Sequence, residues 1–72
     1  MLSFIDSFIV AGIALSLFAN SEHEDLGITT YEIHRDGAPL AVGIRLGGGS
    51  MEPGSDLYET VTAIARREVS NV

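Results

Sequence analysis

The segment 4–19 constrains the fold most, because apolar side chains occupy nearly all of it. Apolar residues recur along it at alternating spacings of four and three, which is typical of one face of a helix. Ser3 and Asp6 resemble the two partners of an N-terminal capping box. We therefore predict an N-terminal helix that is buried on several faces. The predicted apolar stripe consists of Phe4, Phe8, Ala11, Leu15 and Phe18.

A membrane-spanning helix is the alternative interpretation of so apolar a segment. A helix over residues 4–19 would be about 24 Å long, shorter than the roughly 30 Å core of a bilayer. Asp6 lies inside the segment, and no Lys or Arg flanks it as an anchor. The side chains of residues 1–3 lack the positive charge of a signal peptide. We therefore favour a cytoplasmic protein without membrane contact, in which the helix lies in a core or an interface.

The middle of the chain predicts a β-hairpin. Ile28–Arg35 is rich in β-branched residues, and Leu40–Leu46 alternates apolar and small side chains. Asp36 and Gly37 between them suit a turn that needs positive φ. Pro39 is expected to stay outside the hydrogen-bonded ladder.

A second helix is predicted from the N-cap residue Ser55 to Val69, with Arg66 and Arg67 capping its last turn. The predicted fold class is α+β, in the order helix–β-hairpin–helix (αββα). Residues 1–72 form a single domain.

Self-association is expected, because a two-stranded antiparallel sheet is only marginally stable by itself. Two hairpins from two chains would extend the sheet to four strands and pair the free edges. We therefore expect a homodimer, with a different protein as the alternative partner. The expected oligomer interface on the first helix consists of Phe4, Phe8, Ile9, Ile13 and Leu17.

The charge balance bears on the kind of partner. Ten acidic and four basic residues give a net charge of −6. That charge argues against direct nucleic-acid binding and against an anionic membrane surface, and it suits a protein with a basic surface. Solubility alone is the competing explanation for the acidic residues. The candidate partner-binding residues are Glu22, Glu24, Asp25, Glu32, Asp36 and Glu52.

Motifs for catalysis or cofactor binding are weak. The segment 22–25, Glu-His-Glu-Asp, holds potential metal ligands, but neighbours on one loop rarely converge on one ion, and the spacing matches no zinc or EF-hand pattern. The segment 47–50, Gly-Gly-Gly-Ser, lacks the lysine of a P-loop. No serine lies in a nucleophile-elbow sequence, and cysteine is absent. We expect no catalytic residue, no metal and no cofactor.

The hairpin that begins with Tyr31–Gly37, the apolar return strand, the Gly-rich loop and the helix from Ser55 resemble the plan of small phage anti-defence proteins. Anti-CRISPR proteins are the best-known group, and they are short, acidic and poor in cysteine. The resemblance covers about residues 28–69. It implies an inhibitor that docks on a basic nucleic-acid-handling protein in the host cytoplasm without catalysing a reaction.

Three functions follow as hypotheses. The first is a non-enzymatic acidic protein-binding module of the anti-CRISPR-like kind. The second is a structural or assembly subunit that uses the apolar N-terminal helix and a strand edge. The third is a small ligand or metal binder with its site at a dimer interface.

Overall fold

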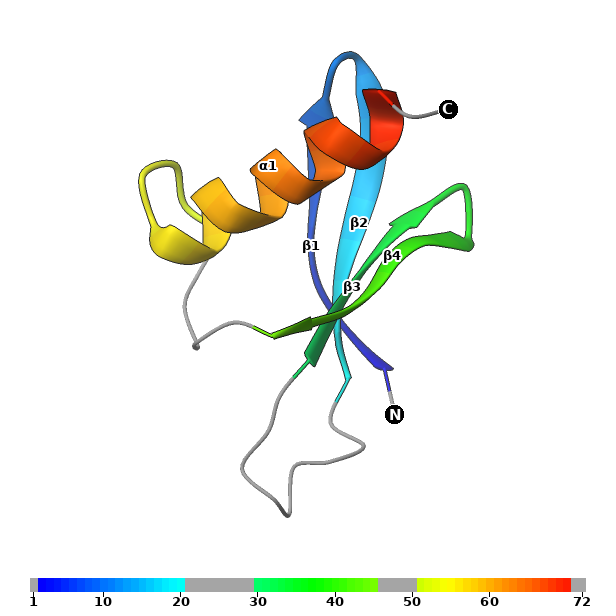
Figure 1. The fold of residues 1–72 in the computed structure, drawn as a ribbon. Helices are drawn as coiled ribbons and strands as arrows, with labels where there is room; N and C mark the ends of the chain where they lie inside the picture. Colours follow the sequence, from blue (N-terminus) through cyan, green and yellow to red (C-terminus); the bar gives the residue numbers. More distant parts are fainter. Residues whose placement is uncertain (1, 21–29, 46–50, 71–72) are drawn as a thin grey trace.

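The computed structural model describes residues 2–20, 30–45 and 51–70. Its elements are β1 (Leu2–Val10), β2 (Ile13–Asn20), β3 (Thr30–Arg35), β4 (Ala38–Arg45) and α1 (Asp56–Ser70). The four strands form one antiparallel sheet in the order β1-β2-β3-β4. Figure 1 shows α1 on one side of this sheet. The layout is therefore ββββα, in two layers.

The predicted N-terminal helix is wrong, because its residues form the β1–β2 hairpin. Val10 pairs with Ile13, and the two residues between them have positive φ, 52° at Ala11 and 78° at Gly12. Positive φ at both central residues defines a type I′ turn, whose twist matches the flanking strands. Alanine is unusual at such a position, so the Ala-Gly pair gave no clear turn signal in the sequence. Once the chain reverses there, a segment that is apolar all round becomes two strands with two faces.

The predicted αββα order, with a two-stranded sheet that a dimer extends to four strands, is therefore wrong. The chain completes a four-stranded sheet by itself because β2 pairs with β3, in a register that sets Leu17 beside Ile33. In the sheet formed by the described residues, β1 and β4 are the two edge strands. The apolar N-terminal segment thus supplies sheet partners for the predicted hairpin instead of a helical cover.

The second hairpin confirms the predicted turn. Arg35 pairs with Ala38 around Asp36 and Gly37, whose φ values are 54° and 80°. Strand β4 begins earlier than predicted and includes Pro39. An edge strand tolerates proline, because its missing N–H removes no bond from the sheet interior.

Helix α1 confirms the predicted C-terminal helix and its N-cap. The side-chain Oγ of Ser55 accepts a hydrogen bond from the Tyr58 N–H at 3.1 Å. Asp56 and Glu59 lie in the first turn and Arg67 in the last, where their charges suit the helix dipole. These end contacts fix where the helix begins and so which of its faces meets the sheet.

The core lies between α1 and one face of the sheet. Alternate residues of a strand point to opposite faces, so one set from each strand meets the helix. Burying these side chains is the main favourable term in forming the two layers. The buried apolar residues are Val10, Leu15, Leu17, Tyr31, Ile33, Leu57, Val61 and Ala65.

The β1–β2 turn yields a direct stability prediction. We expect Ala11→Asn to raise the free energy of unfolding by about 1 kcal/mol, because asparagine adopts positive φ more readily than alanine. Gly12→Ala should lower it by a similar amount, because its φ is 78°. Urea unfolding followed by circular dichroism measures both.

The matched control is Ala63→Asn, at an exposed position of α1. Asparagine there should destabilise by about 0.5 kcal/mol, as it does in helices generally. If Ala11→Asn destabilised the protein like Ala63→Asn, residue 11 would be helical and the hairpin would be contradicted.

Candidate functional site

The sheet has one face that α1 does not cover, called here the open face. Leu15 and Leu17 are buried on the helix side, so their neighbours Ser16 and Phe18 point the opposite way. The strand register extends this assignment to β1, β3 and β4. The open face consists of Leu2, Phe4, Ser7, Ile9, Ala14, Ser16, Phe18, Asn20, Thr30, Glu32, His34, Pro39, Val42 and Arg45.

Three rings cross the open face from β1 to β3. The centroids of Phe4 and Phe18 are 5.7 Å apart, with an edge-to-face angle of 75°. The centroids of Phe18 and His34 are 4.6 Å apart, at 44°. Such cross-strand pairs stabilise a sheet and fix the rotamers of the rings. We call Phe4, Phe18 and His34 the aromatic row.

The polar groups beside the aromatic row bond to one another. His34 Nε2 lies 3.0 Å from Glu32 Oε1, and Asn20 Nδ2 lies 3.4 Å from Glu32 Oε2. Because an ionised carboxylate only accepts hydrogen bonds, both nitrogens donate. The side chains of His34 and Glu32 are only 13% and 15% exposed. Among the described residues, no buried side-chain nitrogen or oxygen lacks a partner.

Ser16, His34 and Glu32 are the residues closest to a catalytic constellation. Ser16 lies opposite His34 across β2 and β3, and His34 contacts the Glu32 carboxylate. Nucleophilic catalysis would need the serine hydroxyl bonded to the histidine. The bonds found within the described part of the chain include none between these two side chains. His34 therefore makes a structural contact with Glu32, and this arrangement does not activate the Ser16 hydroxyl as a nucleophile.

Exposed apolar side chains are concentrated on β1. Leu2 is 43% exposed, Phe4 59% and Ile9 73%, all on the open face. Ile5, at a register shift, is 41% exposed. Surfaces of this kind mark contact sites when the residues adjoin one another. The β1–β2 half of the open face is therefore the strongest candidate site in the described chain.

Both edges of the sheet carry features that oppose pairing with a further strand. On β1 the register shifts between Phe4 and Asp6, and Asp6 Oδ1 accepts the Ser7 N–H at 2.8 Å. That N–H is thus occupied by a side chain. On β4, Pro39 has no N–H, and the register shifts twice along the strand. Bulges, prolines and charges are the usual means of protecting an edge.

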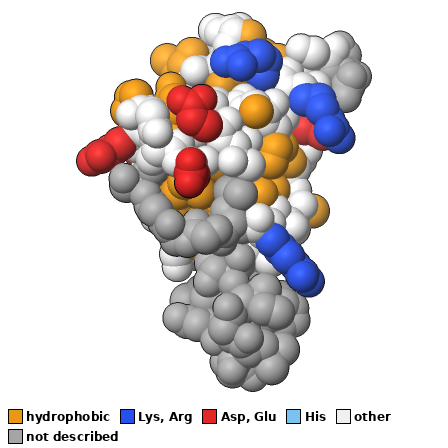
Figure 2. All heavy atoms as spheres, turned by 60° about the vertical axis from the view of Figure 1, so that its left-hand side comes forward, with side chains coloured by type: hydrophobic (Ala, Val, Ile, Leu, Met, Phe, Trp, Pro, Cys, Tyr) orange, Lys and Arg blue, Asp and Glu red, His pale blue; other side chains and the backbone are white. Residues whose placement is uncertain are grey.

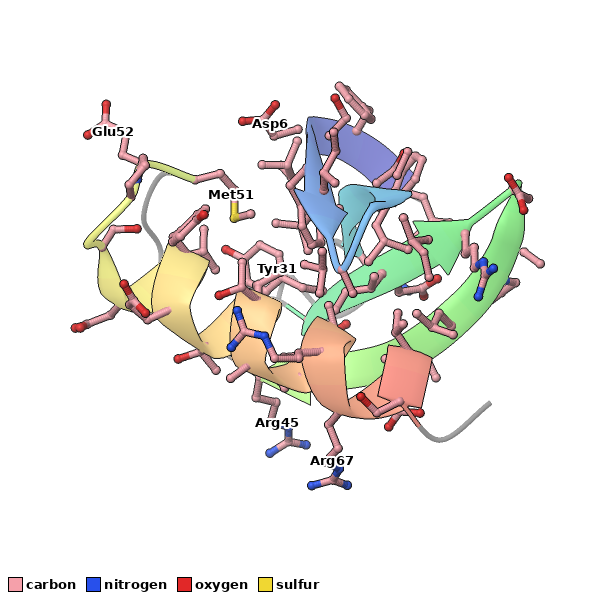
Figure 3. All side chains as sticks on the ribbon, turned by 90° about the horizontal axis from the view of Figure 1, so that it is seen from above. Asp6, Tyr31, Arg45, Met51, Glu52 and Arg67 are labelled. Carbon is pink, nitrogen blue, oxygen red and sulfur yellow. The ribbon has the colours of Figure 1, made fainter. Side chains whose placement is uncertain are left out.

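The predicted acidic residues that the structure describes lie on three different parts of the fold. Glu32 lies on the open face, Asp36 lies in the β3–β4 turn, and Glu52 is exposed ahead of α1. Figure 3 shows Glu52 pointing away from the sheet and from Asp6. Glu22, Glu24 and Asp25, like the rest of segment 22–25 and the glycines at 47–49, lie outside the described residues.

The predicted oligomer-interface residues divide between the two faces. Leu17 is fully buried, and Phe8 and Ile13 pack against the core, all on the helix side. Phe4 and Ile9 are exposed on the opposite side. The prediction that these residues share one face of a helix is wrong, because alternate residues of a strand point to opposite faces of the sheet.

Sequence reasoning missed the contribution of Phe18 and Asn20 to the open face. The signal was present as a simple alternation, in which Ser16, Phe18 and Asn20 interleave with Leu15, Leu17 and Ala19. That pattern is typical of a strand with one buried face. The contact of Glu32 with His34 could have been predicted from the strand Ile28–Arg35 alone, because residues two apart in a strand share a face.

No protein-family model, curated protein or solved structure matches this chain. Within residues 2–20, 30–45 and 51–70, no helix is long and apolar enough to cross a membrane. The same described residues hold no group of three or more His, Asp or Glu side chains that could bind a metal ion. The open face is thus the feature from which a function can be argued.

The protected edge of β1 gives a prediction. We expect Asp6→Ala to increase strand-mediated aggregation severalfold, because it frees the Ser7 N–H and removes an edge charge. Asp6→Asn is the matched variant, since its amide oxygen still accepts that hydrogen bond. Light scattering during incubation at 37 °C reports the difference. Equal aggregation of wild type and Asp6→Ala would show that Asp6 does not protect the edge.

Proposed function

We propose that this chain is a non-enzymatic protein-binding module that contacts its partner through the open face of the sheet. One observation carries the proposal: Phe4 and Ile9 are more than half exposed on a face that no helix of the described residues covers. Apolar side chains in such a position gain the most free energy when another protein covers them.

The polar part of the open face favours the same function. Covering a polar group costs free energy when its hydrogen bonds to water are lost without replacement. Glu32 already accepts bonds from His34 and Asn20, and Phe18 stacks on the His34 ring. A partner can therefore cover this part of the face without leaving these groups unbonded. The aromatic row provides rigid contact area beside it.

Acidic docking on a basic protein is the second candidate, favoured by the net charge of −6. Asp56 and Glu59 lie in the first turn of α1 and Glu52 lies ahead of it, whereas Arg66 and Arg67 lie near its other end. Figure 2 shows acidic side chains gathered on one part of the surface. This candidate includes the phage-type inhibitor of a nucleic-acid-handling protein and action in the cytoplasm. Helix-dipole stabilisation explains the same acidic residues without a partner.

The two candidates differ in residues and in salt dependence. A partner captured with the full chain as bait should bind Phe4→Thr at least tenfold more weakly, because the exposed ring is lost. The double variant Glu52→Gln/Glu59→Gln should bind within about threefold of wild type. Raising salt from about 50 to 500 mM, where the screening length falls from about 14 to 4 Å, should change the affinity little.

Titration calorimetry with the purified partner gives these affinities. Circular dichroism checks that each variant keeps the fold. Affinity that falls more than tenfold with salt and with the glutamine variant, but is unchanged in Phe4→Thr, would reject the open face in favour of acidic docking.

A further inference from the structure

We propose that the occupant of the open face is a second copy of this chain, stacked on the first so that the two open faces meet. This inference rests on the proposed function, because it names the partner for the same surface. The result would be a two-sheet sandwich with one α1 helix on each outer side. Sheets that stack in this way interdigitate their facing side chains about 10 Å apart.

The shape of the sheet favours stacking over edge pairing. On β1 the Ser7 N–H is occupied by Asp6 Oδ1, and a register shift interrupts the strand. On β4, Pro39 offers no donor. A second chain thus finds both edges protected, whereas the open face carries exposed apolar side chains. A face is also self-complementary across a two-fold axis, since each copy presents the same patch to the other.

The area of the open face is close to what a dimer needs. Strands of about eight residues span roughly 26 Å, and four of them cover roughly 19 Å across the sheet, or about 500 Å² in projection. Side chains that stand on this surface raise the accessible area toward the roughly 800 Å² per partner of a standard interface. Covering Phe4, Ile9 and Val42 would remove three exposed apolar side chains from water.

The charge distribution permits the contact although each chain carries −6. The only described carboxylate on the open face is that of Glu32, and His34 and Asn20 hold it. Asp36, in the β3–β4 turn, and Glu52, ahead of α1, lie off this face. Salt screens the general repulsion between two like-charged chains and should therefore not weaken this dimer, whereas it would weaken acidic docking on a basic partner.

Sedimentation equilibrium of the full chain between about 5 and 500 μM tests the inference. The wild type should change from 7.7 kDa toward twice that mass as concentration rises. Phe4→Thr and Ile9→Thr should each raise the dissociation constant at least tenfold. Ala63→Thr is the control, because Ala63 is exposed on α1, which lies on the other side of the sheet. Its dissociation constant should stay within threefold of wild type.

Several outcomes would overturn the inference. A wild-type chain that is monomeric at 500 μM would do so, and so would equal loss of dimer in all three threonine variants. A dimer that Asp6→Ala strengthens and Phe4→Thr leaves unchanged would be an edge-paired dimer instead. If the chain is monomeric but Phe4→Thr weakens its binding to a captured partner, the inference of a second copy is wrong and the proposed function stands.

Discussion

One helix cannot cover both faces of a four-stranded sheet, and the rest of this structure follows from that constraint. Helix α1 packs Leu57, Val61 and Ala65 on one face. The other face keeps Phe4 and Ile9 exposed. Because the first hairpin is apolar on both sides, the chain buries one set of side chains in its own core and leaves the other set exposed.

The features around the exposed face support this division. A sheet with apolar residues on a free edge risks pairing with any other strand. Here Asp6 and a register shift interrupt the β1 edge, and Pro39 interrupts the β4 edge. Both edges are thus poorly suited to backbone pairing with a further strand, so an interaction of this sheet would depend on side chains. The aromatic row and the bonded Glu32 give that face a defined shape.

The sequence pattern predicted the β3–β4 hairpin and the helix α1. The prediction of a helix in the first part of the chain was wrong. Asp36 and Gly37 predicted their turn because aspartate and glycine both accept positive φ, and Ser55 predicted the start of α1 because its hydroxyl caps a free N–H. The first hairpin was missed because its turn has alanine at φ 52°. A strand pair that is apolar on both faces also satisfies helical spacing. The full extent of the open face could not be predicted, since alternation within a strand does not show that β2 pairs with β3.

The most direct test of this account is the NMR spectrum of residues 2–20 in the full chain. The account predicts β-type secondary shifts on both sides of Ala11 and Gly12, together with cross-strand contacts between the Phe4 and Phe18 rings. Those contacts would place both rings on the face that α1 leaves uncovered. Helical shifts through Ala11, with contacts between residues three and four apart, would contradict both the sheet and the binding face argued from it.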